Sequence, residues 1–537
     1  MKNIFAIAAA SLMLVACSGP KETNPLLVTV DGGQLEGINK DGIRVWMGVP
    51  FAAAPVGDLR WCEPQPVEPW DGVRLCDHFG PDPMQPDIFG DMNFLGDGRS
   101  EDCLYLNIWA PAEGNDLPVL IYFNGGGLMA GSGSEPRYAG DSLAHHGVIS
   151  ITANYREGIF GFLAHPELTA QSANHTSGNY GILDQVAAIQ WVKDNIKAFG
   201  GNPDKITIAG ESAGSFSVSV LMASPLSRHN IAGAIGSSGA QMKPRLASNL
   251  AIEEEKGKKL IESKGFDNIA QLRAIPADSI QTLFFPREMS SVCVDGYLLD
   301  KSVDEVFAAN EQAQVPLLAG WNSMEGNMAQ GIAPKDRNKA LSIMKASLGR
   351  TFGNNTDRVL DAFQIKTNDD VFGWNMVELS GALFTAFPTW KWCEMHKVSG
   401  QPVYRYKYNR ARPEMTAAFA GKEAGLAGGV KDKDPNAAEK IETLKGAVHS
   451  ADIEYAMGNL RTNLVYDWQP EDFAVEQTFM HFYINFVKTG NPNGEGLPEW
   501  PVINGAEVAP VMQIDAVSEV KADAQLEKAY QTLDEVF

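Results

Sequence analysis

The chain is poor in positive charge. Its 537 residues include 44 Lys and Arg but 66 Asp and Glu, which gives a formal net charge of −22. Nucleic acids and anionic membrane surfaces are bound through basic patches, so this balance argues against both kinds of partner. We interpret the acidic surface as one that keeps the protein soluble.

Cysteine is also scarce, and the spacing of the six cysteines offers no CxxC pair of the kind that binds zinc. The glycine-rich segment GGGLMAGSG has neither the GxGxxG nor the GxxxxGKS spacing of nucleotide-binding loops. We therefore expect neither a metal site nor a nucleotide cofactor.

No Pro/Ser/Gly-rich linker divides the chain, and no internal repeat is present. Length alone would suggest three or four domains of roughly 150 residues. Without a linker, one large domain with long insertions over residues 26–537 is the better prediction.

The N-terminal apolar run, residues 4–16, is too short to span a bilayer and follows Lys2, as in an export signal. The letters LVAC at 14–17 resemble a bacterial lipobox, in which the cysteine after the cleavage site is lipidated. We predict a signal peptide over 1–16, acyl chains on Cys17 and a flexible tether over 18–25. The body would then be exported from a bacterial cytoplasm and held at a cell-envelope membrane, in the periplasm or at the cell surface; the alternative is a secreted protein with a coincidental cysteine.

Strands and helices alternate through the middle of the chain. After antiparallel edge strands in residues 26–48, β-rich runs such as VLIYF (119–123) and KITIA (205–209) flank a helical pattern at 178–201. This alternation predicts an α/β fold with a mainly parallel sheet and helices on both faces, in an α/β-hydrolase-like arrangement.

The segment KITIAGESAGS places Ser212 between Gly210 and Gly214, where the predicted strand turns sharply into a helix. Such a turn exposes the serine hydroxyl, and the positive end of the following helix favours negative charge that develops there. Ser212 is therefore the candidate nucleophile.

A serine nucleophile needs a histidine base and a carboxylate that orients the histidine. His449 stands out among nine histidines because GAVHSADIEY puts it after a small-residue turn at the start of a helix. Glu325 follows the strand PLLAGWN, in a loop at its carboxyl end. The order Ser212, Glu325, His449 is the chain order of α/β-hydrolase triads.

An ester hydrolase also needs donors for the tetrahedral oxyanion. Gly125, Gly126 and Gly127 come just after the strand VLIYF, separated from it by Asn124, so their backbone N–H groups can approach a substrate closely. Together with the N–H of Ala213 they form a candidate oxyanion hole.

These segments, above all FGGNPDKITIAGESAG (199–214) and EDCLYLN (101–107), resemble the type-B carboxylesterases, which include the bacterial para-nitrobenzyl esterases and, more distantly, the cholinesterases. The resemblance covers nearly the whole chain, from about residue 26 to the mid-500s. It implies the triad Ser212, Glu325 and His449, oxyanion donors at Gly126, Gly127 and Ala213, and supporting roles for Glu211 and Ser238. The implied reaction is hydrolysis of a small-molecule carboxylic ester through an acyl-enzyme, without a cofactor.

The sequence departs from that family at three places. Asn124 replaces a histidine that is frequent before the glycines, and Leu128 replaces an aromatic residue after them, which puts the shape of the acyl pocket in question. A disulfide cysteine of the family is absent at Pro83. Cys76 is its candidate replacement as partner of Cys103, while Cys62 is the alternative partner.

Two segments bear on the substrate. Residues 374–387 could line a pocket but by their spacing are more typical of helix core. Residues 421–446 are interpreted as an insertion that shapes or covers the pocket.

The competing hypotheses for function are a non-catalytic binding protein on the same fold and an esterase for acylated carbohydrates.

Overall fold

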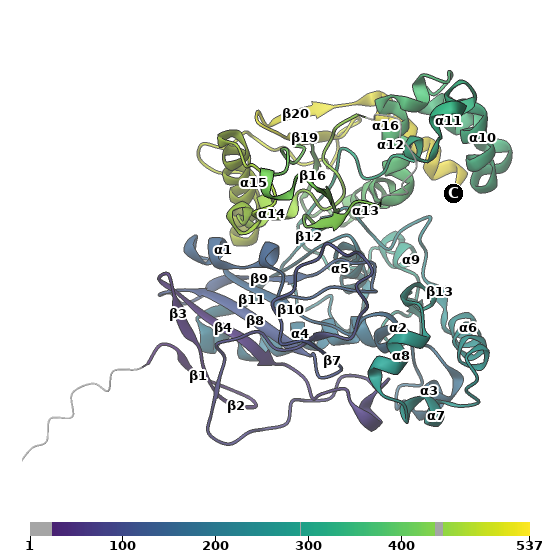
Figure 1. Ribbon diagram of the computed structural model, residues 1–537. Coiled ribbons are helices and arrows are strands. Elements are labelled where there is room, and N and C mark those ends of the chain that lie inside the picture. Colours follow the sequence, from purple (N-terminus) through teal and green to yellow (C-terminus); the bar gives the residue numbers. More distant parts are fainter. Residues whose placement is uncertain (1–23, 290, 435–443) are drawn as a thin grey trace, which may run out of the picture.

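A computed structural model describes residues 24–289, 291–434 and 444–537 (Figure 1). The predicted signal peptide, Cys17 and residues 18–23 of the predicted tether lie outside the described residues. Within the described ranges, no helix has the length and apolar character needed to cross a membrane.

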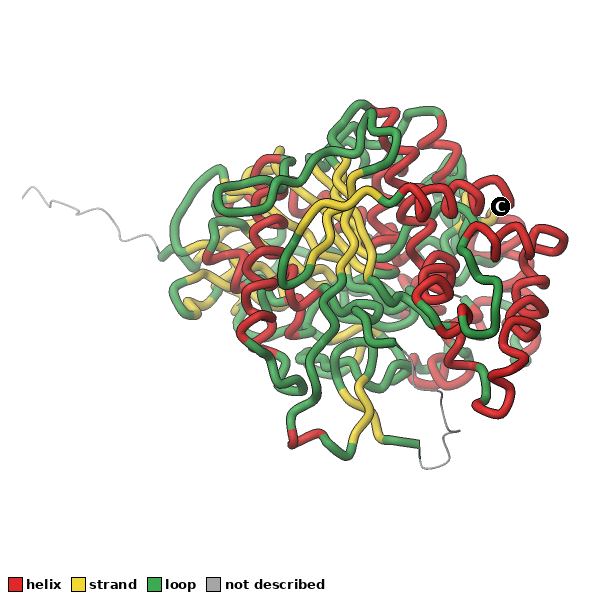
Figure 2. The backbone as a smooth tube through the Cα atoms, turned by 90° about the horizontal axis from the view of Figure 1, so that it is seen from above, coloured by secondary structure: helices red, strands yellow, loops and turns green. Residues whose placement is uncertain are grey.

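The centre of the molecule is an eleven-stranded sheet (Figure 2). Its strands, from one edge to the other, are β20 (Glu519–Ala522), β19 (Pro510–Ile514), β16 (Val403–Tyr408), β15 (Leu317–Asn322), β12 (Gly233–Ser237), β11 (Gly201–Glu211), β9 (Leu117–Phe123), β10 (Ile149–Ala153), β8 (Tyr105–Pro111), β4 (Ile43–Pro50) and β3 (Ile38–Lys40). The strands from β19 to β10 pair in parallel, and the pairs at the two ends of the sheet are antiparallel. The predicted mainly parallel sheet is thus confirmed.

Short strands form four smaller sheets at the periphery. They are β1 (Leu27–Val30) with β2 (Gly33–Glu36) and β5 (Val73–Leu75), β6 (Asp82–Pro83) with β7 (Arg99–Ser100), β13 (Ser248–Asn249) with β14 (Cys293–Val294), and β17 (Lys422–Ala424) with β18 (Val430–Asp432).

Helices cover both faces of the sheet. Alternate residues of β9 show why: Val119 and Ile121 belong to one buried cluster, whereas Leu120 and Tyr122 belong to another on the opposite face. The first cluster is completed by α4 (Tyr180–Asn195), α5 (Ala213–Ala223), α9 (Val303–Ala308) and α13 (Phe387–His396), and the second by α1 (Asp141–His145), α14 (Ile453–Met457) and α15 (Pro470–Thr489).

The remaining helices form two satellite groups (Figure 1). One group has its own core and comprises α10 (Ala340–Phe352), α11 (Thr356–Ala362), α12 (Trp374–Gly381) and α16 (Ala524–Val536). The other comprises α2 (Gly158–Phe162), α3 (Pro166–Gln171), α6 (Leu250–Ser263), α7 (Ile269–Arg273) and α8 (Ala277–Leu283). All of these helices except the C-terminal α16 lie in segments inserted between strands of the sheet.

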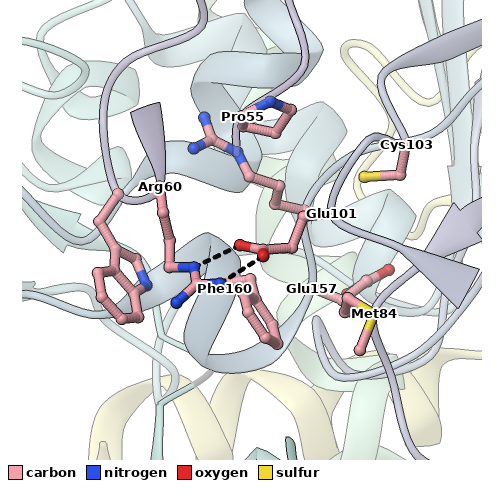
Figure 3. Close-up of a pocket in the computed structure, with 9 residues that line it drawn as sticks. Pro55, Arg60, Met84, Glu101, Cys103, Glu157 and Phe160 are labelled. Atoms are coloured by element: carbon pink, nitrogen blue, oxygen red, sulfur yellow. Dashed lines mark hydrogen bonds and ion pairs between the residues drawn. The ribbon is translucent and has the colours of Figure 1, made fainter. Parts of the chain in front are cut away.

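The segment EDCLYLN serves the packing of the fold. Glu101 accepts two hydrogen bonds from the Arg60 guanidinium, at 2.6 and 2.5 Å, and both side chains are almost completely buried (Figure 3). Asp102 accepts a hydrogen bond from the Tyr105 hydroxyl at 2.9 Å. These hydrogen bonds anchor the chain at the start of β8.

The predicted bridge between Cys76 and Cys103 is not present: both are free, buried thiols, as is Cys293, and Cys62 is also free. Cys76 follows β5 and its Sγ lies 3.8 Å from the carbonyl oxygen of Arg74, whereas Cys103 lies near the Arg60–Glu101 pair (Figure 3). Burial raises the pKa of the Cys76 thiol to about 12 and also raises that of Cys103. Each thiol therefore stays protonated in its own buried surroundings.

Candidate active site

The turn after β11 has the geometry predicted for a nucleophile. Ser212 adopts φ 55° and ψ −122°, a strained conformation for a non-glycine residue, and it is the N-cap of α5. A Cβ at Gly214 would lie 2.1 Å from the carbonyl oxygen of Phe123, and one at Gly210 would lie 2.4 Å from Gly214. The two glycines are needed because the helix begins directly against the strand ends.

Glu325 and His449 meet because their two loops pair with each other. The N–H of Met324 donates to the carbonyl of Ala447 at 2.8 Å, in a parallel bridge between Met324 and Val448. This pairing brings His449 Nδ1 to 2.5 Å from Glu325 Oε2, with both side chains buried. The structure thus joins the two residues that the sequence placed 124 positions apart.

The other imidazole nitrogen faces the nucleophile turn. His449 Nε2 lies 3.2 Å from Oε1 of Glu211, the residue before Ser212. The Ser212 hydroxyl has no hydrogen bond to another described residue, but Ser212 and His449 line the same cavity. Contacts between nucleophile and base are often long in the absence of substrate.

The two carboxylates set the protonation of the imidazole. Burial by itself lowers the pKa of His449, but the negative charges of Glu211 and Glu325 outweigh it and leave the pKa raised to about 9. Burial likewise raises the pKa of Glu211, although His449 opposes that shift. The site therefore stabilises an imidazolium strongly, which suits a base that must hold a proton during reaction.

The glycine loop after β9 leaves backbone donors free. Gly126 has φ +113°, and a Cβ there would lie 1.6 Å from the carbonyl oxygen of Ala130, so only glycine fits. Gly127 also has a positive φ of +69°. In the described part of the chain, neither glycine N–H nor that of Ala213 donates to another protein group, and all three residues line the cavity. The predicted oxyanion donors are thus available at one place.

A buried hydrogen-bond network fixes Glu325. Its Oε1 accepts from the Ser238 hydroxyl at 2.5 Å and from the Asn322 N–H at 2.6 Å. The Asn322 amide donates in turn to Ser238 Oγ at 3.2 Å and to Asp452 Oδ1 at 3.1 Å, and the Tyr406 hydroxyl donates to Asp452 at 3.0 Å. Both oxygens of the glutamate are thus held with little freedom to turn.

Sequence reasoning identified Ser238 in this network but missed Asn322 and Asp452. Asp452 is the N-cap residue of α14, three positions after His449, so its local pattern indicates only a helix start. Asn322 ends β15, where an amide gives no signal of its own. Their proximity to Glu325 depends on contacts across the sheet.

Ser212 and His449 line a cavity of about 720 Å³. Its apolar lining comes from well-separated segments: Met92, Leu128, Phe216, Phe384 and Leu426. The aromatic ring of Phe384 packs edge-on against the His449 imidazole, with 4.9 Å between the ring centroids. The volume is sufficient for a drug-sized ester.

The segment 374–387 is both core and pocket. Most of it packs inside the satellite core as α12 and the start of α13, as its spacing favoured. A π-helical turn at Ala382–Ala386, however, directs Phe384 and Thr385 into the cavity.

Of the segment 421–446, Leu426 and Ala427 line the cavity, while residues 435–443 lie outside the described part.

The two departures near the glycine loop differ in position. Asn124 is buried behind the loop, where its Nδ2 donates to Glu157 Oε1 at 3.1 Å and to the Gly125 carbonyl at 3.0 Å. Leu128, in contrast, lines the cavity. Leu128 is therefore the departure that changes the shape of the pocket.

Comparison with known proteins gives a consistent result. The model of the carboxylesterase family matches residues 24–533. Fumonisin B1 esterase of Sphingopyxis macrogoltabida is 35% identical over 456 residues, which cover 81% of this chain and 80% of that one. Among solved structures, Geobacillus stearothermophilus carboxylesterase EST55 has a TM-score of 0.77 at 29% identity and covers 94% of this chain and 100% of its own. PNB esterase has a TM-score of 0.76 at 26% identity, with 95% and 99% covered.

Proposed function

The chain belongs to the carboxylesterase family and is a carboxylic ester hydrolase, and we propose that it hydrolyses esters through an acyl-enzyme formed on Ser212. The observation that carries this proposal is the pairing of His449 Nδ1 with Glu325 Oε2 at 2.5 Å, beside a strained serine on the same cavity. Such a pair presents the second imidazole nitrogen as a proton acceptor.

In the first half of the reaction, His449 accepts the proton of the Ser212 hydroxyl as Oγ attacks the ester carbonyl. The oxyanion that forms accepts hydrogen bonds from the N–H groups of Gly126, Gly127 and Ala213. The tetrahedral intermediate then collapses, the bond to the alcohol oxygen breaks, and His449 Nε2 gives its proton to the departing alcohol. The acyl group remains on Ser212.

In the second half, His449 removes a proton from water, which attacks the acyl carbonyl, and the same donors stabilise the second oxyanion. Collapse releases the carboxylic acid and returns the proton to Ser212 Oγ. Glu325 holds the Nδ1–H tautomer of His449, while Ser238 and Asn322 hold Glu325.

The proposal is tested by comparing Ser212→Ala with wild type on 4-nitrophenyl butyrate. We expect kcat to fall by about 10⁶ because the nucleophile is removed. Ser263→Ala, which removes an exposed hydroxyl on α6, is the control for the effects of purification and should retain wild-type turnover. Equal turnover by Ser212→Ala and wild type would refute the proposal.

We further propose that the enzyme is exported and anchored by acyl chains on Cys17. The support is the sequence alone: the short apolar run at 4–16, the LVAC letters at 14–17 and the polar residues that follow. In a bacterial host fed radiolabelled palmitate, the wild-type protein should carry label and sediment with membranes. Cys17→Ala should carry none and stay in the soluble fraction; label on that variant would overturn the assignment.

A further inference from the structure

The cavity lined by Ser212 and His449 carries positive charge, part of which has no carboxylate partner among the described residues. Four cationic side chains line it. Arg137 pairs with Glu135 at 2.8 Å, and Lys256 pairs with Glu253 at 2.7 Å. Within residues 24–289, 291–434 and 444–537, the other two, Arg245 and Arg287, have no carboxylate at ion-pair distance.

Arg245 is held close to the reacting groups. Its guanidinium lies 5.7 Å from the ring centroid of Phe216 and 5.8 Å from that of Phe384. Phe384 contacts the His449 ring, and Phe216 stands one helical turn after Ser212, whose carbonyl accepts its N–H at 2.9 Å. Two aromatic rings thus position the cation between the triad and the outer cavity.

Arg245 and Arg287 are both exposed, so water solvates their guanidinium groups. The other carboxylates of the cavity do not supply a partner, because Glu253 is paired with Lys256 and Glu211 faces His449. Both arginines remain charged at neutral pH and can bind an anion that enters the cavity. The overall negative charge would repel an anionic substrate, and local cations in a cleft offset that repulsion.

We propose that Arg245, assisted by Arg287, binds a free carboxylate on the substrate, so that the preferred substrates are esters that carry a second, ionised carboxyl group. The planar guanidinium forms paired hydrogen bonds with a carboxylate. The substrate is then either a half-ester of a dicarboxylic acid, whose acyl part carries the free carboxylate, or an ester whose alcohol part carries it. This inference rests on the proposed function, since it concerns the same cavity.

The test compares charged and neutral esters of matched length. For the acyl part, mono(4-nitrophenyl) adipate is compared with 4-nitrophenyl hexanoate; for the alcohol part, 4-carboxyphenyl hexanoate is compared with phenyl hexanoate. In at least one pair, wild type should show the higher kcat/KM for the charged ester. Arg245→Met, which keeps an apolar stem against Phe216 and Phe384, should lower the charged-to-neutral ratio about 10- to 100-fold.

Two controls define the effect. Lys259→Met removes an exposed cation of α6 that pairs with Glu255 at 2.9 Å, so it changes the net charge equally and should leave the ratio unchanged. Arg245→Lys keeps the charge but loses the fork and should retain part of the preference. No preference in either pair, or an equal fall of the ratio in Lys259→Met, would overturn the proposal.

A binding measurement separates this proposal from the hydrolytic one. Calorimetric titration of Ser212→Ala with adipate should show binding that weakens about 10-fold or more when Arg245→Met is added. If neutral esters are hydrolysed but adipate binding does not depend on Arg245, only the carboxylate site fails. If no ester is hydrolysed but adipate binds through Arg245, the proposed function fails and the carboxylate site stands.

Discussion

The floor and the rim of the cavity are built in different ways. The floor is formed by Ser212, His449 and the glycine loop, with Glu325 behind His449. It lies at the carboxyl ends of the parallel strands β9, β11 and β15, and a buried network holds Glu325 in place. The rim, formed by Phe216, Arg245, Phe384 and Leu426, comes from a helix and from inserted segments. The difference indicates that the strand ends fix the reaction while the insertions select the substrate.

The largest effect short of removing the nucleophile is expected from Glu325→Gln in the floor. The amide cannot stabilise the imidazolium or hold the Nδ1–H tautomer, so kcat should fall by about 10⁴ on charged and neutral esters alike. Steady-state kinetics with both esters measures this, and Glu519→Gln on the exposed edge strand β20 serves as control. A change of selectivity without loss of rate would contradict the division into floor and rim.

The glycine loop should respond less strongly. In Gly126→Ala the added methyl would meet the Ala130 carbonyl oxygen at 1.6 Å, so the loop must move and its oxyanion donor is displaced. We expect kcat to fall by about 10²–10³. Gly331→Ala, where nothing lies within 4 Å of the new Cβ, should match wild type. Thermal unfolding of both variants distinguishes a displaced donor from a failure to fold.

A shift in pH dependence is expected from Glu211→Gln. The Glu211 carboxylate raises the pKa of His449, and its removal lowers that pKa, so neutral imidazole persists to lower pH. The acidic limb of kcat/KM should therefore move to lower pH. Glu311→Gln, at an exposed pair with Lys301, should leave the limb in place. An acidic limb that stays fixed or moves to higher pH in Glu211→Gln would show that the two groups are not coupled.

The smallest effect is expected at the rim, from Leu426→Ala. Its side chain is 49% exposed and lines the cavity, whereas its carbonyl, which accepts from Ser450 Oγ at 2.6 Å, is unaffected by the change. The preference between 4-nitrophenyl acetate and 4-nitrophenyl octanoate should shift about fivefold, with little change for acetate. A comparable loss on both esters would place Leu426 with the floor.

The floor was predictable because its signals are local. A strand pattern followed by glycines marks both the turn at Ser212 and the loop at Gly126, and each is completed by residues adjacent in sequence. The positions of Glu325 and His449 followed from chain order and from the resemblance. What joins them, the pairing of Met324 with Val448, is a contact between distant segments that no local pattern reveals.

The rim was not predictable for the same physical reason. Arg245 follows β12 in a stretch without clear periodicity, and its place beside Phe384 depends on how an insertion folds over the sheet. Helical spacing assigned the segment 374–387 mainly to core. The π-helical turn changes which side chains face outward, and a period of 3.6 residues cannot anticipate it.

The disulfide prediction failed because the spacing of cysteines says nothing about their separation in space.

Mass spectrometry of the protein after treatment with a fluorophosphonate, which reacts with an activated serine, tests whether Ser212 is the nucleophile. We expect one adduct per molecule, on the tryptic peptide that contains Ser212, its loss in Ser212→Ala, and slow formation in Glu325→Gln. Hydrolysis of 4-nitrophenyl butyrate that continues while Ser212 remains unlabelled, or an adduct on another serine, would contradict that assignment.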